Sequence, residues 1–335
     1  MTDTVNSNVT VEPYTNSLFS QLKRTLLRQE MLLVVFIIFF GLILANQNDR
    51  FLSSRNVERE LVLLFEVALI AIPMTFIIIT GGIDLSVGSI FGLSAVVLGF
   101  AWQDWGFSMW GAIAAALLAG TACGFFNGFF IVQFRIPPLI MTLATLALFR
   151  GIALGISQGR SARGFPDWYF EIGRGDLMGL PNQVWILGFM LFLFGIVLTF
   201  TPFGRSLYAI GNNEVASRFA GLPVRKNKLL IYMFSGFMCG LAAVVFVSRV
   251  STTRSDMGVG MELDVIAAVV LGGTSIFGGS GTLSGTILGL LLIRVLTSGL
   301  LLSGFKGDAT IIMIGTILIA SILINDIIQR RLMKS

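Results

Sequence analysis

The chain has 335 residues, of which 55% are hydrophobic and 12% charged, and its formal net charge is +5. A soluble domain of this length needs charged surface and cannot keep so many apolar side chains from water, so a soluble globular protein is excluded. Repeated apolar runs of about 20 residues predict an all-α, polytopic membrane protein, and their continuity argues against a transmembrane β-barrel.

Charged and reactive residues narrow the class further. The basic residues flank the apolar runs, where the positive-inside rule expects them, so we do not interpret the positive charge as nucleic-acid binding. The chain has no histidine and two cysteines, Cys123 and Cys239, both within predicted helices. These residues argue against histidine-based catalysis, a disulfide framework and a metal site, and we predict no catalytic residues.

The apolar runs predict roughly ten crossings of the bilayer, some of them interrupted by glycine-rich breaks. In chain order the runs are Met31–Ala45, Leu61–Thr80, a third that ends near Ala101, Met109–Val132, Leu139–Ile156, Val184–Thr201, Leu229–Val250, the short Val265–Leu271, Leu283–Leu302 and Thr310–Ile324. Residues 31–327 are then the transmembrane domain, between a polar tail over 1–30 and a basic tail over 328–335. Ten crossings place both tails on one side, and the flanking arginines and lysines favour the cytoplasm.

Residues Phe203–Lys228 form a polar, basic stretch between two apolar runs. A short helix is expected inside it, because Asn212 or Asn213 can cap its start and Gly221, followed by Pro223, ends it. One interpretation is a solvated loop between membrane helices. The other is a docking helix for a partner outside the membrane.

Two glycine-rich stretches interrupt the apolar runs, and we call them the first break (Gly81–Ser89) and the second break (Gly272–Gly281). Paired broken segments favour a transport path, because irregular backbone at membrane depth is tolerated only beside protein or water. Two tight turns at the membrane surface are the alternative. The predicted path residues are Gly81, Gly82, Asp84, Ser86, Gly272, Gly273, Thr274 and Arg294. The second break lacks the lysine of a phosphate-binding loop, so we expect no nucleotide site in this chain.

Four charged residues stand alone in apolar runs, where each is costly unless it faces protein, water or the interface. They are Glu66, Arg150, Arg249 and Arg294. Arg150 and Arg249 lie near the ends of their runs, and we expect them to extend to the interface. Arg294 lies in the middle of its run, which predicts a structural partner or a place on the path.

Four motifs carry a family resemblance that covers about Val57–Asn325. They are GGIDLSVGSIFGL, FNGFFIVQFRIPPLIMTLATLALFRGIA, FGRSLYAIGNNEVASRFAGLPV and LDVIAAVVLGGTSIFGGSGTLSGTILG. Together they resemble the membrane permease subunits of bacterial sugar ATP-binding cassette (ABC) importers, the ribose/xylose/arabinose type, near the rhamnose and autoinducer-2 branch.

The resemblance implies a multi-pass permease of the bacterial inner membrane that passes a monosaccharide or related neutral solute. It implies as partners ATP-binding subunits that carry the ATP, a second permease subunit, identical or homologous, and a periplasmic binding protein. The binding protein would contact the loops Ser157–Gln183 and Ser251–Gly260. The matching coupling residues are Gly211, Asn213, Glu214, Arg218 and Gly221.

Three alternatives remain at this stage. An ion-coupled secondary transporter fits the paired breaks, but the chain shows no coupling-ion site. A related ABC permease for branched-chain amino acids needs fixed countercharges on the path, for which only Arg294 and Asp84 are candidates. An intramembrane enzyme needs a nucleophile and base or a metal cluster, and neither constellation is present.

Overall fold

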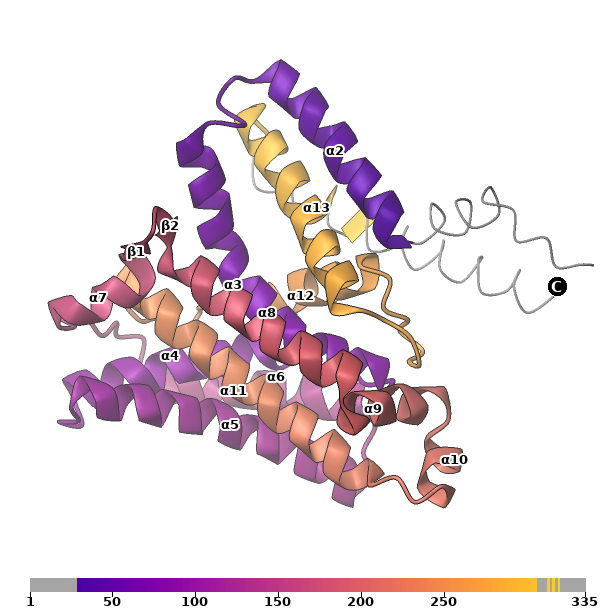
Figure 1. Ribbon diagram of the computed structural model, residues 1–335. Coiled ribbons are helices and arrows are strands. Elements are labelled where there is room, and N and C mark those ends of the chain that lie inside the picture. The colour runs from indigo at the N-terminus through magenta and orange to yellow at the C-terminus, as the bar shows by residue number, and fades with distance from the viewer. Residues whose placement is uncertain (1–28, 306–311, 314, 317–318, 320–335) are drawn as a thin grey trace, which may run out of the picture.

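The computed structural model describes residues 29–305, 312–313, 315–316 and 319. Within those ranges the fold is almost entirely helical, with a single short hairpin (Figure 1). Its elements are α2 (Gln29–Gln47), α3 (Ser54–Ile79), α4 (Val87–Gln103), α5 (Met109–Gln133), α6 (Pro138–Ser157), α7 (Asp167–Arg174), β1 (Asp176–Leu177), β2 (Leu180–Pro181), α8 (Asn182–Phe200), α9 (Pro202–Asn212), α10 (Glu214–Phe219), α11 (Val224–Val250), α12 (Met261–Leu271) and α13 (Leu283–Leu302).

Seven of the described helices are long and apolar enough to cross a membrane, namely α2, α3, α5, α6, α8, α11 and α13. The polytopic all-α prediction is therefore confirmed, whereas the count of ten crossings is not. Helix α4 has 17 residues and α12 has 11. The predicted last span, and nearly all of both predicted tails, lie outside the described residues.

Helices α3, α4 and α11 form the centre of the bundle. Every residue of α4 from Val87 to Ala101 is buried, and so is nearly all of the second half of α3. Helices α2 and α8 instead expose large apolar side chains such as Phe39 and Phe192. Such exposure is unfavourable in water and costs nothing against lipid tails, so the burial pattern fits a bundle whose outer helices face the bilayer.

Small residues set the close packing of α5 against α11. A Cβ atom added to Gly124 would lie 2.1 Å from the carbonyl oxygen of Tyr232, and one added to Gly236 would lie 2.0 Å from that of Gly120. Any side chain at these positions would push the two backbones apart. The glycine-rich composition of the fourth predicted span therefore has a direct packing reason.

The two ends of the bundle carry different small elements (Figure 1). At one end, the predicted loop Ser157–Gln183 contains α7 and the β1–β2 hairpin. At the other end, the stretch Phe203–Lys228 contains two helices, α9 and α10, and runs into α11. Helices α8 and α11 connect these ends, so a movement of α9 and α10 acts directly on two long helices.

The isolated charges are paired inside the protein, and the expectation that Arg150 and Arg249 extend to the interface is wrong. Arg249 forms an ion pair with Glu66 of α3 at 2.6 Å. Arg150 donates to the backbone carbonyls of Ser255 and Met257 at 2.6 and 2.7 Å. Charged groups in an apolar bundle are stabilised when they find such partners, and here tertiary contacts supply them.

Candidate translocation and coupling site

The first break begins where α3 ends. Gly81 has a φ of 75°, a left-handed conformation that favours glycine. The amide of Gly82 donates to the carbonyl of Ile77 at 3.0 Å and closes the end of the helix. The glycine pair therefore stops α3 and turns the chain toward Asp84.

Asp84 is fully buried, and its carboxylate is held by hydrogen-bond donors. Its Oδ1 atom accepts from the Ser86 amide at 3.0 Å and from the Ser86 hydroxyl at 2.6 Å. Its Oδ2 atom accepts from Ser235 of α11 at 3.2 Å. The Ser86 hydroxyl in turn accepts from Asn127 of α5 at 2.8 Å. This network ties the first break to α5 and α11. Asn127 and Ser235 were missed by the sequence reasoning, although each is a polar residue in an apolar run.

The second break follows α12, which is about 16 Å long at 1.5 Å per residue and too short to cross a hydrocarbon core of about 30 Å. After Leu271 the chain turns through Gly273, Gly278 and Gly279, all with positive φ. It then enters α13 at Leu283. Helix α12 is the helical part of a segment that runs from the α7 end of the bundle, where Arg174 bonds to Arg249 and Ser251, to the α9 end, where Tyr208 bonds to Gly281.

The two breaks meet at the end of α9. The Gly279 amide donates to the carbonyl of Ile79 at 2.9 Å, which joins the second break to the end of α3. A Cβ atom added to Gly211 would lie 1.8 Å from the Ile79 oxygen and 2.4 Å from the Gly279 nitrogen. Tyr208 of α9 also donates to the carbonyl of Gly281 at 2.8 Å. The structure thus brings the predicted path residues around Gly81 and the predicted coupling residue Gly211 into one junction.

The loop Ser251–Gly260 enters the middle of the bundle. A Cβ atom on Gly88 would lie 2.2 Å from the Gly258 oxygen, and one on Gly92 would lie 2.6 Å from the Met257 oxygen. These glycines belong to the buried first half of α4. Arg150 of α6 holds the same loop through the two carbonyls described above. The loop therefore covers α4 and leads directly into α12. Sequence reasoning could not detect this arrangement, because Gly88, Gly92 and Arg150 all meet backbone carbonyls of the loop.

The predicted coupling segment is built from two capped helices. Thr201 caps α9 by accepting from the Gly204 amide at 3.2 Å. Asn213 caps α10 by accepting from the Ala216 amide at 2.9 Å. Gly221, with a φ of 80°, follows the end of α10. The start and stop signals of α10 are therefore confirmed, whereas α9 was not predicted as a helix.

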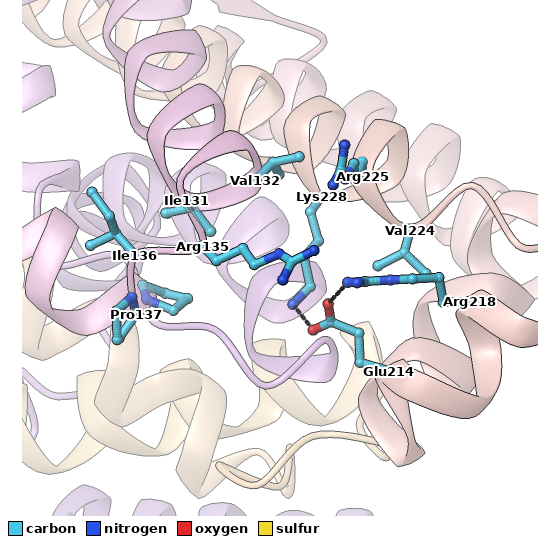
Figure 2. A pocket seen from close by; sticks show the side chains of 11 residues that line it. Ile131, Val132, Arg135, Ile136, Pro137, Glu214, Arg218, Val224, Arg225 and Lys228 are labelled. Carbon is cyan, nitrogen blue, oxygen red and sulfur yellow. Dashed lines mark hydrogen bonds and ion pairs between the residues drawn. The ribbon is translucent and has the colours of Figure 1, made fainter.

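Glu214 lies at the start of α10 and bonds to two cations (Figure 2). Its carboxylate accepts from Arg218 at 2.8 Å and from Lys228 of α11 at 2.6 Å. Partial burial disfavours the carboxylate, but the hydrogen bond and charge of Lys228, together with Arg218, outweigh that effect and hold the pKa of Glu214 below its usual range. Glu214 therefore stays ionised at neutral pH and fastens α10 to α11.

Arg294 is the one predicted path residue that the structure places apart from the junction. Its guanidinium is paired with Glu60 of α3, and it lines an apolar hollow of about 280 Å³ near α2. A structural partner was one of the two expectations for Arg294, and Glu60 is that partner.

In the described part of the chain, no group of three or more histidine, cysteine, aspartate or glutamate residues is arranged to hold a metal ion.

Comparison with known proteins defines the class. The model of the family described as "Branched-chain amino acid transport system / permease component" matches residues 56–322, and the chain belongs to this family. It is 36% identical over 284 residues to the ribose import permease protein RbsC of Haemophilus influenzae, covering 84% of this chain and 87% of that protein. It is 37% identical over 300 residues to the autoinducer 2 import system permease protein LsrD of Yersinia enterocolitica serotype O:8, covering 86% and 87%.

These relatives confirm the prediction of an ABC importer permease subunit and do not support the alternatives weighed from the sequence. The chain is a transport subunit and not an enzyme. Together with the seven apolar helices, the relatives identify a multi-pass protein of the inner membrane.

Proposed function

We propose that this chain forms one half of the path by which a monosaccharide or related neutral solute enters the cell. Relatives named for ribose import and for autoinducer 2 import favour a small, hydroxyl-rich solute over an amino acid. The residues of the two breaks, from Gly81 to Ser86 and from Gly272 to Thr274, would line or control that path. Arg294 would support the fold around that path without lining it, because its charge is already paired with Glu60.

The complete importer would hold two copies of this permease or one copy with a homologue. The cytoplasmic ATP-binding subunits would bind α9 and α10 and would carry the ATP. The periplasmic binding protein would deliver the solute at the opposite end, where α7 and the β1–β2 hairpin lie, near Ser157–Gln183 and Ser251–Gly260. Both termini and the stretch Phe203–Lys228 would then be cytoplasmic, as the flanking basic residues favour.

The junction at Gly211 is the observation that carries this proposal. Because Gly211 packs against the backbone of Ile79, at the end of α3 just before the first break, and of Gly279 in the second break, α9 cannot shift without moving at least one of these segments. Closure of the ATP-binding subunits would move α10 and α9 as a rigid body and so rearrange the breaks. Uphill movement of a neutral solute requires work, and this arrangement transmits it from a subunit that hydrolyses ATP.

The test is a charge reversal at α10 in the reconstituted importer. Glu214→Lys would place a lysine beside Arg218 and Lys228, and Arg218→Glu would place two carboxylates one helical turn apart. We expect both to reduce solute-stimulated ATPase activity about tenfold. Glu214→Lys breaks the ion pair between α10 and α11, Arg218→Glu breaks the ion pair within α10, and each adds repulsion.

The control is Arg50→Glu, an exposed reversal in the turn between α2 and α3, which should leave coupling unchanged. Wild-type coupling in both α10 variants would count against α10 as the docking helix. Uptake that runs on an ion gradient in vesicles without ATP would overturn the importer mechanism itself.

A further inference from the structure

A basic pocket lies beside α10, where the turn between α5 and α6 faces the start of α11 (Figure 2). The basic pocket is a hollow of about 190 Å³, and its charged lining residues are Arg135, Glu214, Arg218, Arg225 and Lys228. Its remaining walls are apolar and include Pro137 and Pro138. Four cations and one carboxylate give the basic pocket a surplus of positive charge, in a space on the scale of one side chain.

The one carboxylate of the basic pocket is already engaged. Glu214 binds Arg218 and Lys228 at 2.8 and 2.6 Å, as described above. In residues 29–305, no acidic side chain lies within ion-pair distance of Arg135 or Arg225. Figure 2 shows Arg135 reaching toward Glu214 and Arg218 from the α5–α6 turn. The basic pocket therefore has donors left over for an anion from outside this chain.

Arg135 occupies its place at a conformational cost. Its φ of 56° lies in the left-handed region, which glycine adopts freely and other residues do not. The turn would form more easily with glycine, and what arginine adds is its side chain. The guanidinium of Arg135 lines the basic pocket next to the Pro137–Pro138 wall (Figure 2).

An apolar surface adjoins the basic pocket on α10. Val215 and Phe219 are 65% and 89% exposed, and their spacing of four residues places them on one helical face. Helix α10 has six residues and lies between α9 and α11, outside the long spans. Glu214 and Arg218, the residues that precede Val215 and Phe219 in the chain, line the basic pocket, so α10 carries the apolar face and part of the pocket lining together.

We propose that the basic pocket receives a carboxylate side chain of the cytoplasmic ATP-binding subunit while Phe219 packs into an apolar recess of the same subunit. The inference rests on the proposed docking of α10 and adds the chemistry of the partner surface, an apolar recess with an acidic rim. A planar guanidinium binds a carboxylate through two parallel hydrogen bonds, which suits Arg135 to this role. Glu214 would orient Arg218 and Lys228 and would not itself meet the partner.

The experiment measures the affinity of the co-purifying ATP-binding subunit for the full-length permease in nanodiscs of neutral lipid. Arg135→Glu should weaken binding about tenfold or more, and Arg135→Lys should weaken it less, because lysine keeps the charge and loses the second parallel hydrogen bond. Arg135→Gly is the decisive variant, because glycine suits the backbone at this position. It should unfold at the wild-type temperature or above and still bind about tenfold more weakly. Lys226→Glu, an exposed reversal at the start of α11 outside the basic pocket, is the matched control.

Each other outcome overturns a defined part of the proposal. If Arg135→Gly binds like wild type while Phe219→Ala does not, the carboxylate in the basic pocket is excluded and the docking of α10 stands. If Phe219→Ala and the Arg135 variants all bind like wild type, the docking of α10 fails as well. If Lys226→Glu weakens binding equally, general electrostatic attraction replaces the basic pocket. If the loss appears only in nanodiscs containing phosphatidylglycerol, the basic pocket holds a lipid phosphate and the proposal is overturned.

Discussion

The two glycine breaks resemble each other in sequence and differ in what holds them. The first break is fastened through side chains, because buried Asp84 accepts hydrogen bonds from Ser86 and from Ser235 of α11. The second break has no charged residue, and the Thr274 hydroxyl is buried without a hydrogen-bond partner among the described residues. Phe277 of the second break is 73% exposed.

This difference separates a fixed element from a movable one. The first break is anchored to two central helices, whereas the second is held by backbone contacts and by Tyr208 of α9. Weakly held segments open first when a protein rearranges. We therefore expect the second break to move with α9 and the first to act as its support.

The largest effect should come from Gly211→Ala, which disturbs both breaks at once. The added Cβ atom would lie 1.8 Å from the Ile79 oxygen, so the backbones must separate. Overpacking of this kind costs about 3 kcal/mol of folding free energy, and transport should be lost. Thermal unfolding and uptake measure the two effects. Gly195→Ala in α8, where nothing lies within 4 Å of the new atom, is the control and should be neutral or stabilising.

Asp84→Ala should come next and should act on the first break alone. Loss of the Asp84 carboxylate leaves the Ser235 hydroxyl and the Ser86 amide without their buried acceptor, which costs about 2 to 3 kcal/mol of folding free energy. Asp84→Asn keeps one acceptor oxygen and should cost about 1 kcal/mol. Chemical or thermal unfolding of the two variants in detergent would show the difference. Equal stability of wild type and Asp84→Ala would refute the anchoring role of the carboxylate.

Tyr208→Phe should affect the second break moderately. The change removes the single hydrogen bond from α9 to Gly281, worth about 1 kcal/mol, and preserves the ring. We expect solute-stimulated ATPase activity to fall severalfold with little change in unfolding temperature. A drop in stability without loss of coupling would mean that this bond serves the fold and not transmission.

Thr274→Val should have the smallest effect and the opposite sign from Asp84→Ala. Valine has nearly the shape of threonine, and the buried hydroxyl that it removes has no partner among the described residues. Replacing an unsatisfied polar group with an apolar one of the same shape is neutral or stabilising by up to about 1 kcal/mol. A marked destabilisation would show that Thr274 has a partner that forms in another state of the importer.

Sequence signals predicted correctly those features that depend on contacts within a few residues of the chain. The start and end of α10 follow from Asn213 and Gly221, because a cap is a hydrogen bond or a backbone angle within a few residues. Pro73 lies inside α3, and membrane helices tolerate proline where neighbouring groups satisfy the freed carbonyl. Helix α9 was missed because its polar face and Gly211 suit a loop equally well, until packing against Ile79 and Gly279 selects the helix.

Pairing between distant segments could not be read from the chain. Glu66 and Arg249 are 183 positions apart in the chain, and Glu60 and Arg294 are 234 positions apart. Arg150 binds only backbone carbonyls, which every residue offers. No local pattern marks such partners, so the wrong expectation for Arg150 and Arg249 was a consequence of reading each helix by itself.

The sequence alone determined the membrane class, most of the spans, the caps of α10 and the presence of two broken segments. These properties depend on hydrophobicity over about 20 residues or on contacts within one turn. Only the tertiary structure decided that the two breaks meet, that the segment containing α12 joins the two ends of the bundle, and that α9 packs on the junction at Gly211. Those features depend on close contacts between backbone atoms of segments that are remote in the chain, at positions where glycine leaves room. The amino-acid sequence does not specify which glycines face each other.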